Sequence, residues 1–107
     1  EGAVGYAAGA LLNGDGKGAD AEVFTLYVVR AAQRAGVGRA LLKSAARVLR
    51  AEGAKSLMLF VLTRNDPARR FYERLGGEVF AEVASNGWGR GLTETGYRWM
   101  DIARLAA

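Results

Sequence analysis

A largely apolar stretch runs through a glycine-containing turn directly into an amphipathic segment, and this junction limits the possible folds more than any other part of the chain. Residues 22–29 predict a central strand of a sheet. Apolar residues then recur at helical spacing on one face, at Val37, Leu41, Ala45 and Val48. Basic residues line another face of the same segment, and Gly53 supplies a stop signal. The sequence therefore predicts strand, turn and helix in immediate succession.

The turn before this helix is suited to bind phosphate. Glycines at positions 36 and 38 remove the side chains that would keep a ligand away from the backbone. The first amides of the helix lack intrahelical partners and point toward any anion placed there. The helix dipole and the side chains of Arg34 and Arg39 add positive potential. We therefore expect a phosphate-bearing ligand at this turn.

Two common glycine motifs do not match this turn. A P-loop is excluded because no Gly-Lys-Ser/Thr follows the glycines. The dinucleotide-binding fingerprint fits poorly, because Leu41 stands where its third glycine or alanine belongs. In addition, the next predicted strand is wholly apolar over residues 57–62 and ends without an acidic residue for a ribose.

The pattern that remains is Gln-x-x-Gly-x-Gly at residues 33–38, after a strand that ends in Tyr-Val-Val. One helix and one strand later, residues 65–76 read Asn-Asp-Pro-Ala-Arg-Arg-Phe-Tyr-Glu-Arg-Leu-Gly. In both motifs and in their order the sequence resembles the GNAT superfamily of N-acetyltransferases, over about residues 1–102. The resemblance implies that the glycine turn cradles the pyrophosphate of coenzyme A.

The resemblance implies a single GNAT-like domain over residues 1–107, an α/β fold with a mixed, mostly antiparallel sheet flanked by two helices. The family's first strand, its two following helices and most of the next strand have no counterpart here, and Gly77 stands where phenylalanine is common. We expect a fragment, a natural minimal form, or a chain that completes its acceptor site with a partner. A homodimer is expected, because a sheet that starts at Ala3 leaves an edge and a core face uncovered.

The other elements follow from local signals. Strands are expected over residues 3–12, 55–62, 78–84 and 93–102, with turns at 13–18 and at Asn86-Gly87 and a loop through residues 87–91. A helix is expected from Asp66, as its N-cap, through Pro67 to Leu75. Its inner face would carry Ala68, Phe71, Tyr72 and Leu75.

Composition narrows the chemistry. The chain of 107 residues, 50% hydrophobic, can bury one core, and its longest apolar run cannot span a bilayer. Without a recognisable signal segment, a cytoplasmic location is the default. The absence of Cys and His excludes a disulfide scaffold, a thiol nucleophile and zinc-thiolate sites, and we expect no metal. The net charge of +4 is assigned to binding of one polyanionic cofactor, because the arginines flank the glycine turn instead of forming an arm. Nucleic-acid binding is not expected, because no recognised motif is present.

The resemblance also assigns the cofactor contacts. The pantetheine arm would pair with the backbone of the predicted central strand like an added strand. The implied acetyl-CoA contacts are Leu26, Tyr27, Val28, Gln33, Arg34, Ala35, Gly36, Val37, Gly38, Arg39, Asn65, Ala68 and Arg69.

Acetyl transfer to an amine requires a neutral amine, a polarised carbonyl and a proton for the departing thiolate. Tyr72 matches the family's usual proton donor, and Glu22 occupies the place of the catalytic glutamate in histone-type members. The alternative for Tyr72 is a core tyrosine with a satisfied hydroxyl, and for Glu22 a solvated strand residue. Phe60 stands where ribosomal-type N-terminal acetyltransferases carry a glutamate, which counts against that specialisation.

Two functions remain open from the sequence. One is an N-acetyltransferase that moves acetyl from acetyl-CoA directly to an amine of a small molecule or protein, in a ternary complex, because no cysteine offers an acyl-enzyme nucleophile. The other is a non-catalytic module that binds acyl-CoA.

Overall fold

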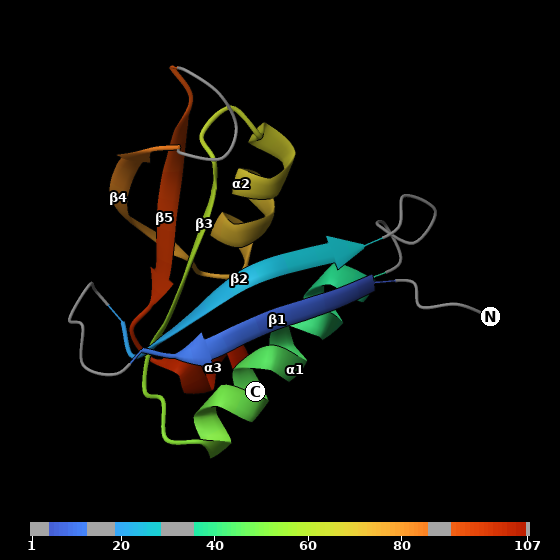
Figure 1. Cartoon of the computed structure of the whole chain (residues 1–107). Coiled ribbons are helices and arrows are strands. Elements are labelled where there is room, and N and C mark those ends of the chain that lie inside the picture. The colour runs from blue at the N-terminus through green and yellow to red at the C-terminus, as the bar shows by residue number, and fades with distance from the viewer. Residues whose placement is uncertain (1–4, 13–18, 29–35, 86–90, 107) are drawn as a thin grey trace.

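The computed structural model describes residues 5–12, 19–28, 36–85 and 91–106. They form five strands and three helices in the order β1 (Gly5–Leu11), β2 (Ala21–Val28), α1 (Val37–Ala51), β3 (Leu57–Leu62), α2 (Asp66–Arg74), β4 (Glu78–Ala84), β5 (Thr93–Trp99) and α3 (Ile102–Ala106) (Figure 1). The strands make one sheet in the order β1-β2-β3-β5-β4. Only β2 and β3 pair in parallel within this sheet, so the prediction of a mixed, mostly antiparallel α/β fold is confirmed.

All three helices contribute to one core on the same face of the sheet. Alternation along the strands directs Ala21 and Val23 of β2, Leu57 and Leu59 of β3, and Tyr97 and Trp99 of β5 into this core. The helices add Leu42, Ala46 and Leu49 from α1, Tyr72 from α2, and Ile102, Leu105 and Ala106 from α3. The predicted inner face of α2 is confirmed, because its three other members pack against this core.

The parallel pairing of β2 with β3 is short and holds only one end of the two strands together. It runs from Ala21 opposite Leu57 to Val23 opposite Leu59, although β2 continues to Val28 and β3 to Leu62. Beyond this point the two strands diverge, as Figure 1 shows. A bulge contributes, because β1 pairs with residues 23 and 25 of β2 and leaves Phe24 as the extra residue, which bends the strand.

Hydrogen bonds fasten the closed end of the pair. The backbone N–H of Asp20 donates to Oγ of Ser56 at 2.9 Å, and a carboxylate oxygen of Asp20 accepts from the backbone N–H of Lys55 at 2.9 Å. These residues directly precede β2 and β3, so the starts of the two strands are held side by side.

Two predictions were wrong, one about the place of β2 in the sheet and one about which face of α1 is buried. The strand expected to be central, β2, lies second in the sheet, and β3 is the central one. On α1 the buried stripe is Leu42, Ala46 and Leu49, one residue along from the predicted stripe, and Val48 is 58% exposed. The helix has apolar residues on both stripes, and contacts with β1, β2 and α3 select between them.

Two element ends also differ from expectation. Asn65, not Asp66, is the N-cap of α2, because the carbonyl and side chain of Asn65 accept the first helical N–H groups. The last strand ends at Trp99, and the chain then forms α3, whose first N–H donates to the carbonyl of Lys55 at 2.9 Å. This short helix was not predicted, since its stability comes from packing on α1.

The predicted strand over residues 78–84 is confirmed as β4, and the helix ending before Gly53 is confirmed as α1. The predicted turns at 13–18 and Asn86-Gly87, and most of the loop through 87–91, lie outside the described residues. None of the helices described here is long and apolar enough to cross a membrane.

Candidate active site

The N-terminus of α1 has the backbone geometry expected of an anion site. Gly36, its N-cap, has φ 80° and ψ 8°, a left-handed conformation that glycine adopts without strain. Among the described residues no side chain caps this end, and no acidic residue lies in the first turn of the helix. The first helical hydrogen bond runs from the N–H of Ala40 to the carbonyl of Gly36 at 3.0 Å. The N–H groups of residues 37–39 therefore have no intrahelical acceptor, and the helix dipole makes the site attractive to phosphate.

The described residues leave space around this helix end. A Cβ built on Gly36 would meet none of their atoms within 4 Å, and Gly36 and Arg39 are exposed. The implied contacts at Gln33, Arg34 and Ala35 lie outside the described residues, so their contribution stays a prediction. Gly36, Val37, Gly38 and Arg39 are brought together at the helix terminus as the sequence suggested.

The divergence of β2 and β3 leaves backbone groups of both strands unpaired with each other. Past Val23 and Leu59 neither strand has a registered partner on the facing edge, in the part of the chain that the structure describes. An extended ligand can hydrogen-bond to such an edge as an added strand would. The implied pantetheine contacts Leu26, Tyr27 and Val28 all lie on this part of β2, which leads toward α1.

Tyr72 lies on α2 beneath an aromatic cluster contributed by β5. Its side chain is 8% exposed, with ring centroids 5.9 Å from Tyr97 and 6.3 Å from Trp99, the latter in an edge-on arrangement. No described residue hydrogen-bonds to its hydroxyl, and burial alone raises the pKa of this phenol. The Tyr72 ring is thus packed in the core while its hydroxyl keeps a hydrogen-bond donor that no described residue uses, so this donor is available to a ligand acceptor.

Asn65 precedes α2 at the open end of β3 and has a structural role. Its Oδ1 accepts from the N–H of Ala68 at 3.3 Å, which makes Asn65 a helix cap. Its side chain is exposed, and this bond occupies only the carbonyl half of the amide. The cap and the implied pantetheine contact are therefore compatible.

Arg69 and Ala68, the other implied contacts on α2, face different surroundings. Ala68 is half-buried and packs against the core. The guanidinium of Arg69 donates through Nε to the hydroxyl of Tyr97 and through Nη1 to the carbonyl of Thr63, both at 3.1 Å. Arg69 is thus engaged within the protein, a role that its place in the sequence motif did not suggest.

Glu22 lies on the sheet face opposite the helices, one residue before β2 and β3 separate. Its neighbours Ala21 and Val23 are buried in the core, so alternation directs Glu22 to the other face, beside Met58. Phe60 shares that face and packs its ring 5.8 Å from Phe80. Glu22 and the core side chain of Tyr72 therefore lie on opposite faces of the sheet.

Tyr97 and Glu73 were not identified from the sequence. Tyr97 is 0% exposed, and its hydroxyl donates to Oε2 of Glu73 at 2.6 Å. The available signal was alternation: Thr95, Tyr97 and Trp99 share one face of the last strand, and an inward tyrosine needs a hydrogen-bond partner.

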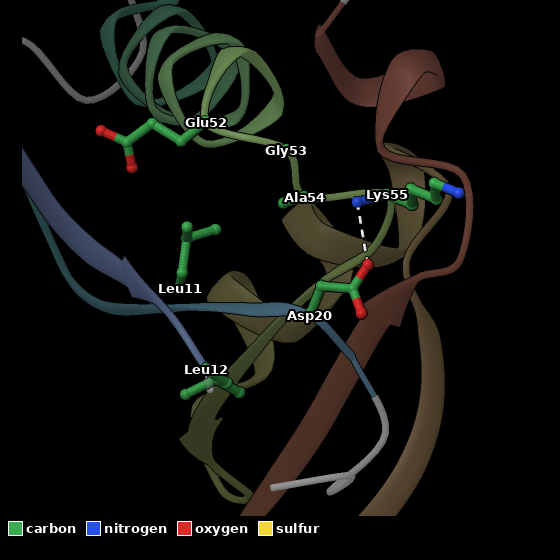
Figure 2. Close-up of a pocket in the computed structure, with 7 residues that line it drawn as sticks. All are labelled: Leu11, Leu12, Asp20, Glu52, Gly53, Ala54 and Lys55. Carbon is green, nitrogen blue, oxygen red and sulfur yellow. Dashed lines mark hydrogen bonds between the residues drawn. The ribbon is translucent and has the colours of Figure 1, made fainter. Parts of the chain in front are cut away.

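A cavity of about 410 Å³ lies at the far end of α1, where the helix ends and the closed ends of β2 and β3 begin. It is lined by Leu11, Leu12, Asp20, Glu52, Gly53, Ala54 and Lys55. Figure 2 shows the Asp20 carboxylate bonded to the backbone of Lys55 and the Glu52 carboxylate directed away from both of these residues. None of the predicted site residues lines this cavity. Within the described ranges, no cluster of His, Cys, Asp or Glu suits a metal ion.

The five-stranded mixed sheet and its helices form the α/β fold of a solved GNAT-family protein, over 92% of this chain. The model of the acetyltransferase (GNAT) family matches residues 1–77, and the chain belongs to this family.

Individual relatives agree with the family assignment. The N-acetyltransferase YuaI of Bacillus subtilis, itself uncharacterized, is 33% identical over 101 residues, which are 94% of this chain and 58% of YuaI. A GNAT-family protein from Desulfovibrio desulfuricans has a TM-score of 0.76 at 27% identity, covering 92% of this chain and 61% of that one. YncA from Salmonella typhimurium, solved with its cofactor acetyl-CoA, has a TM-score of 0.62 at 28% identity, covering 75% and 49%. The chain thus spans about three fifths of the length of the first two relatives.

Proposed function

We propose that the protein transfers the acetyl group of acetyl-CoA directly to an amine, of a small molecule or of a protein, within a ternary complex. The observation that carries this proposal is the side chain of Tyr72, which is buried against Tyr97 and Trp99 and whose hydroxyl has no partner among the described residues. Family membership and the acetyl-CoA bound in YncA support the donor.

The donor would be held mainly by backbone. Its pyrophosphate would accept hydrogen bonds from the N–H groups at the start of α1, and its pantetheine would lie along the open edge of β2. A backbone N–H of β2 would then polarise the thioester carbonyl. Side chains need only supply and remove protons.

The proton balance uses two residues on opposite faces of the sheet. The amine attacks the thioester carbon after losing a proton, which Glu22 would accept directly or through water. The carbon–sulfur bond breaks as the amide bond forms, and the Tyr72 phenol gives its proton to the leaving thiolate. Because burial raises the pKa of Tyr72, this phenol is protonated at neutral pH and ready to donate.

The test of the catalytic proposal is Tyr72→Phe, which keeps the ring and its packing and removes the proton. We expect kcat to fall by about 10²- to 10⁴-fold while the affinity for coenzyme A is retained. Free-thiol release from acetyl-CoA, measured with a panel of amines, reports turnover. A variant that is less stable but turns over at the wild-type rate would show that the hydroxyl serves the core.

The test of the cofactor site is Gly38→Asp, which places a carboxylate at the start of α1. We expect calorimetric binding of coenzyme A to be lost, because two anions would compete for the same backbone N–H groups. Ala51→Asp adds the same charge at the other end of α1 and should bind normally. Equal affinities for the two variants would refute the site.

If coenzyme A binds but no amine in the panel causes thiol release from acetyl-CoA, the alternative function is favoured, a non-catalytic acyl-CoA-binding module.

We further propose a homodimer that acts in the cytoplasm. The strand β1 forms an edge of the described sheet, and Phe24 of the neighbouring strand is 58% exposed. Light scattering that reports a monomer at micromolar concentration would exclude the dimer, and cell fractionation tests the location.

A further inference from the structure

The hydroxyl of Tyr97 connects β5 to α2 directly beside Tyr72. It donates to Oε2 of Glu73 at 2.6 Å and accepts from Nε of Arg69 at 3.1 Å. Tyr97 is completely buried, and its ring centroid lies 5.9 Å from that of Tyr72. The connection reaches β3 as well, because Arg69 also donates to the carbonyl of Thr63 at 3.1 Å. One buried phenol thus contacts α2 on both sides of Tyr72 in the sequence.

The chemistry of this network favours a rigid geometry. Burial and the hydrogen bond to Glu73 raise the pKa of Tyr97, against a lowering effect of Arg69, so the phenol is a donor at neutral pH. A short bond to a carboxylate and a bond from a guanidinium are both stronger than bonds between neutral groups. Glu73 follows Tyr72 directly, and Arg69 lies one helical turn before it. The network therefore restrains the helix turn that carries Tyr72.

A simple packing role would be served by the ring alone. Tyr72 is already enclosed by Phe71, Tyr97 and Trp99, with ring centroids between 5.3 and 6.3 Å away. A phenylalanine at position 97 would preserve that enclosure. The hydroxyl with two charged partners adds control over the orientation of α2 on the sheet, because ring contacts allow sliding where directional hydrogen bonds do not.

We propose that Tyr97 is a positioning residue for Tyr72, and that its hydroxyl, through Glu73 and Arg69, holds the Tyr72 phenol where the thiolate leaves. This inference rests on the proposed function, in which Tyr72 is the proton donor. It assigns a role in turnover to a residue that touches neither the acetyl donor nor the acceptor.

The experiment compares Tyr97→Phe with wild type in the thiol-release assay. We expect kcat to fall about tenfold, because a small misplacement of a catalytic group is costly, while KM for acetyl-CoA changes less than about twofold. In a Tyr72→Phe background, Tyr97→Phe should have no further effect on kcat, since the group it positions is gone. Ile102→Val, a core change on α3, controls for loss of stability and should leave kcat unchanged at a temperature where all variants are folded.

Replacements of Glu73 provide a rescue test. Glu73→Gln keeps an acceptor oxygen for the Tyr97 hydroxyl and should retain most of kcat, whereas Glu73→Ala should match Tyr97→Phe. The inference is overturned if Tyr97→Phe lowers only thermal stability, raises KM instead, or lowers kcat equally in both backgrounds. If Tyr72→Phe itself keeps the wild-type kcat, the proposed function of Tyr72 fails. If Tyr72→Phe lowers kcat but Tyr97→Phe does not, only the positioning role of Tyr97 fails.

Discussion

Gly77 is a position where one added methyl group should lower stability by steric overlap. A Cβ there would lie 2.8 Å from Cζ2 and 3.1 Å from Cη2 of Trp99, and 3.0 Å from the carbonyl oxygen of Tyr72. Carbon atoms in contact normally stay about 3.5 to 4.0 Å apart, so the overlap is severe. Gly77 does not have a positive φ, so the cost of Gly77→Ala is steric and not conformational.

The indole of Trp99 cannot move away easily. It is 3% exposed, and its Nε1 donates to the carbonyl of Leu75 at 3.0 Å. Overpacking a core in this way costs about 1–3 kcal/mol, offset by up to about 1 kcal/mol from the reduced freedom of the unfolded chain. A net loss of about 1–2 kcal/mol should lower the melting temperature of a domain of this size by about 4 to 16 °C in Gly77→Ala. The same geometry explains how the chain tolerates glycine where the family commonly has phenylalanine: the Trp99 ring fills that space.

The assay is denaturant unfolding of a double-mutant cycle with Trp99→Phe, which removes the fused ring that the new methyl group would meet. The destabilisation by Gly77→Ala should shrink by about 1 kcal/mol or more in that background. Gly53→Ala is the comparison: Gly53 has φ 108° and open space around it, so its cost is conformational and should be the same in both backgrounds. Strict additivity for Gly77 and Trp99, or an unaltered Gly77→Ala, would refute the steric explanation.

Three further predictions concern the groups that hold the site in place. Burial raises the pKa of Tyr72, so the stability that the neutral phenol contributes is complete below the ordinary phenol pKa of about 10 and is lost as pH rises through the folded-state pKa. Measured by calorimetry, the melting temperature of Tyr72→Phe should therefore fall less steeply above about pH 10 than that of wild type. Asn65→Ala should destabilise by about 1 kcal/mol through loss of the α2 cap, and Asn65→Asp, which can still cap, should not; equal losses in urea unfolding would contradict the capping role. Asp20→Ala removes the acceptor for the Lys55 N–H and should speed hydrogen exchange of that amide, whereas unchanged protection would show that this bond does not hold the closed ends of β2 and β3.

Local signals in the sequence were sufficient for the parts of the site that depend on neighbours in the chain. The glycine at position 36, the helix that follows it and the strand over residues 78–84 were all predicted within a residue or two. The shared inner face of α2 was also predictable, because helical spacing alone places Ala68, Phe71, Tyr72 and Leu75 together. The family motifs added the prediction that this backbone binds coenzyme A, which helical and strand periodicity cannot supply.

Tertiary structure alone decided the features that depend on distant residues. Two neighbouring stripes of α1 are apolar, one that contains Leu41 and one that contains Leu42. The contacts of α1 with β1, β2 and α3 bury the stripe that contains Leu42. Two other features depend on residues more than twenty positions apart in the sequence. One is the pairing of β2 with β3, which ends at Val23 and Leu59, and the other is the hydrogen bond from Tyr97 to Glu73. Caps, glycine turns and helical periodicity are set by interactions within about four residues, so a sequence displays them directly. Which of several suitable surfaces pack together depends on the free energy of the whole sheet and its helices, and that choice appears only in the folded chain.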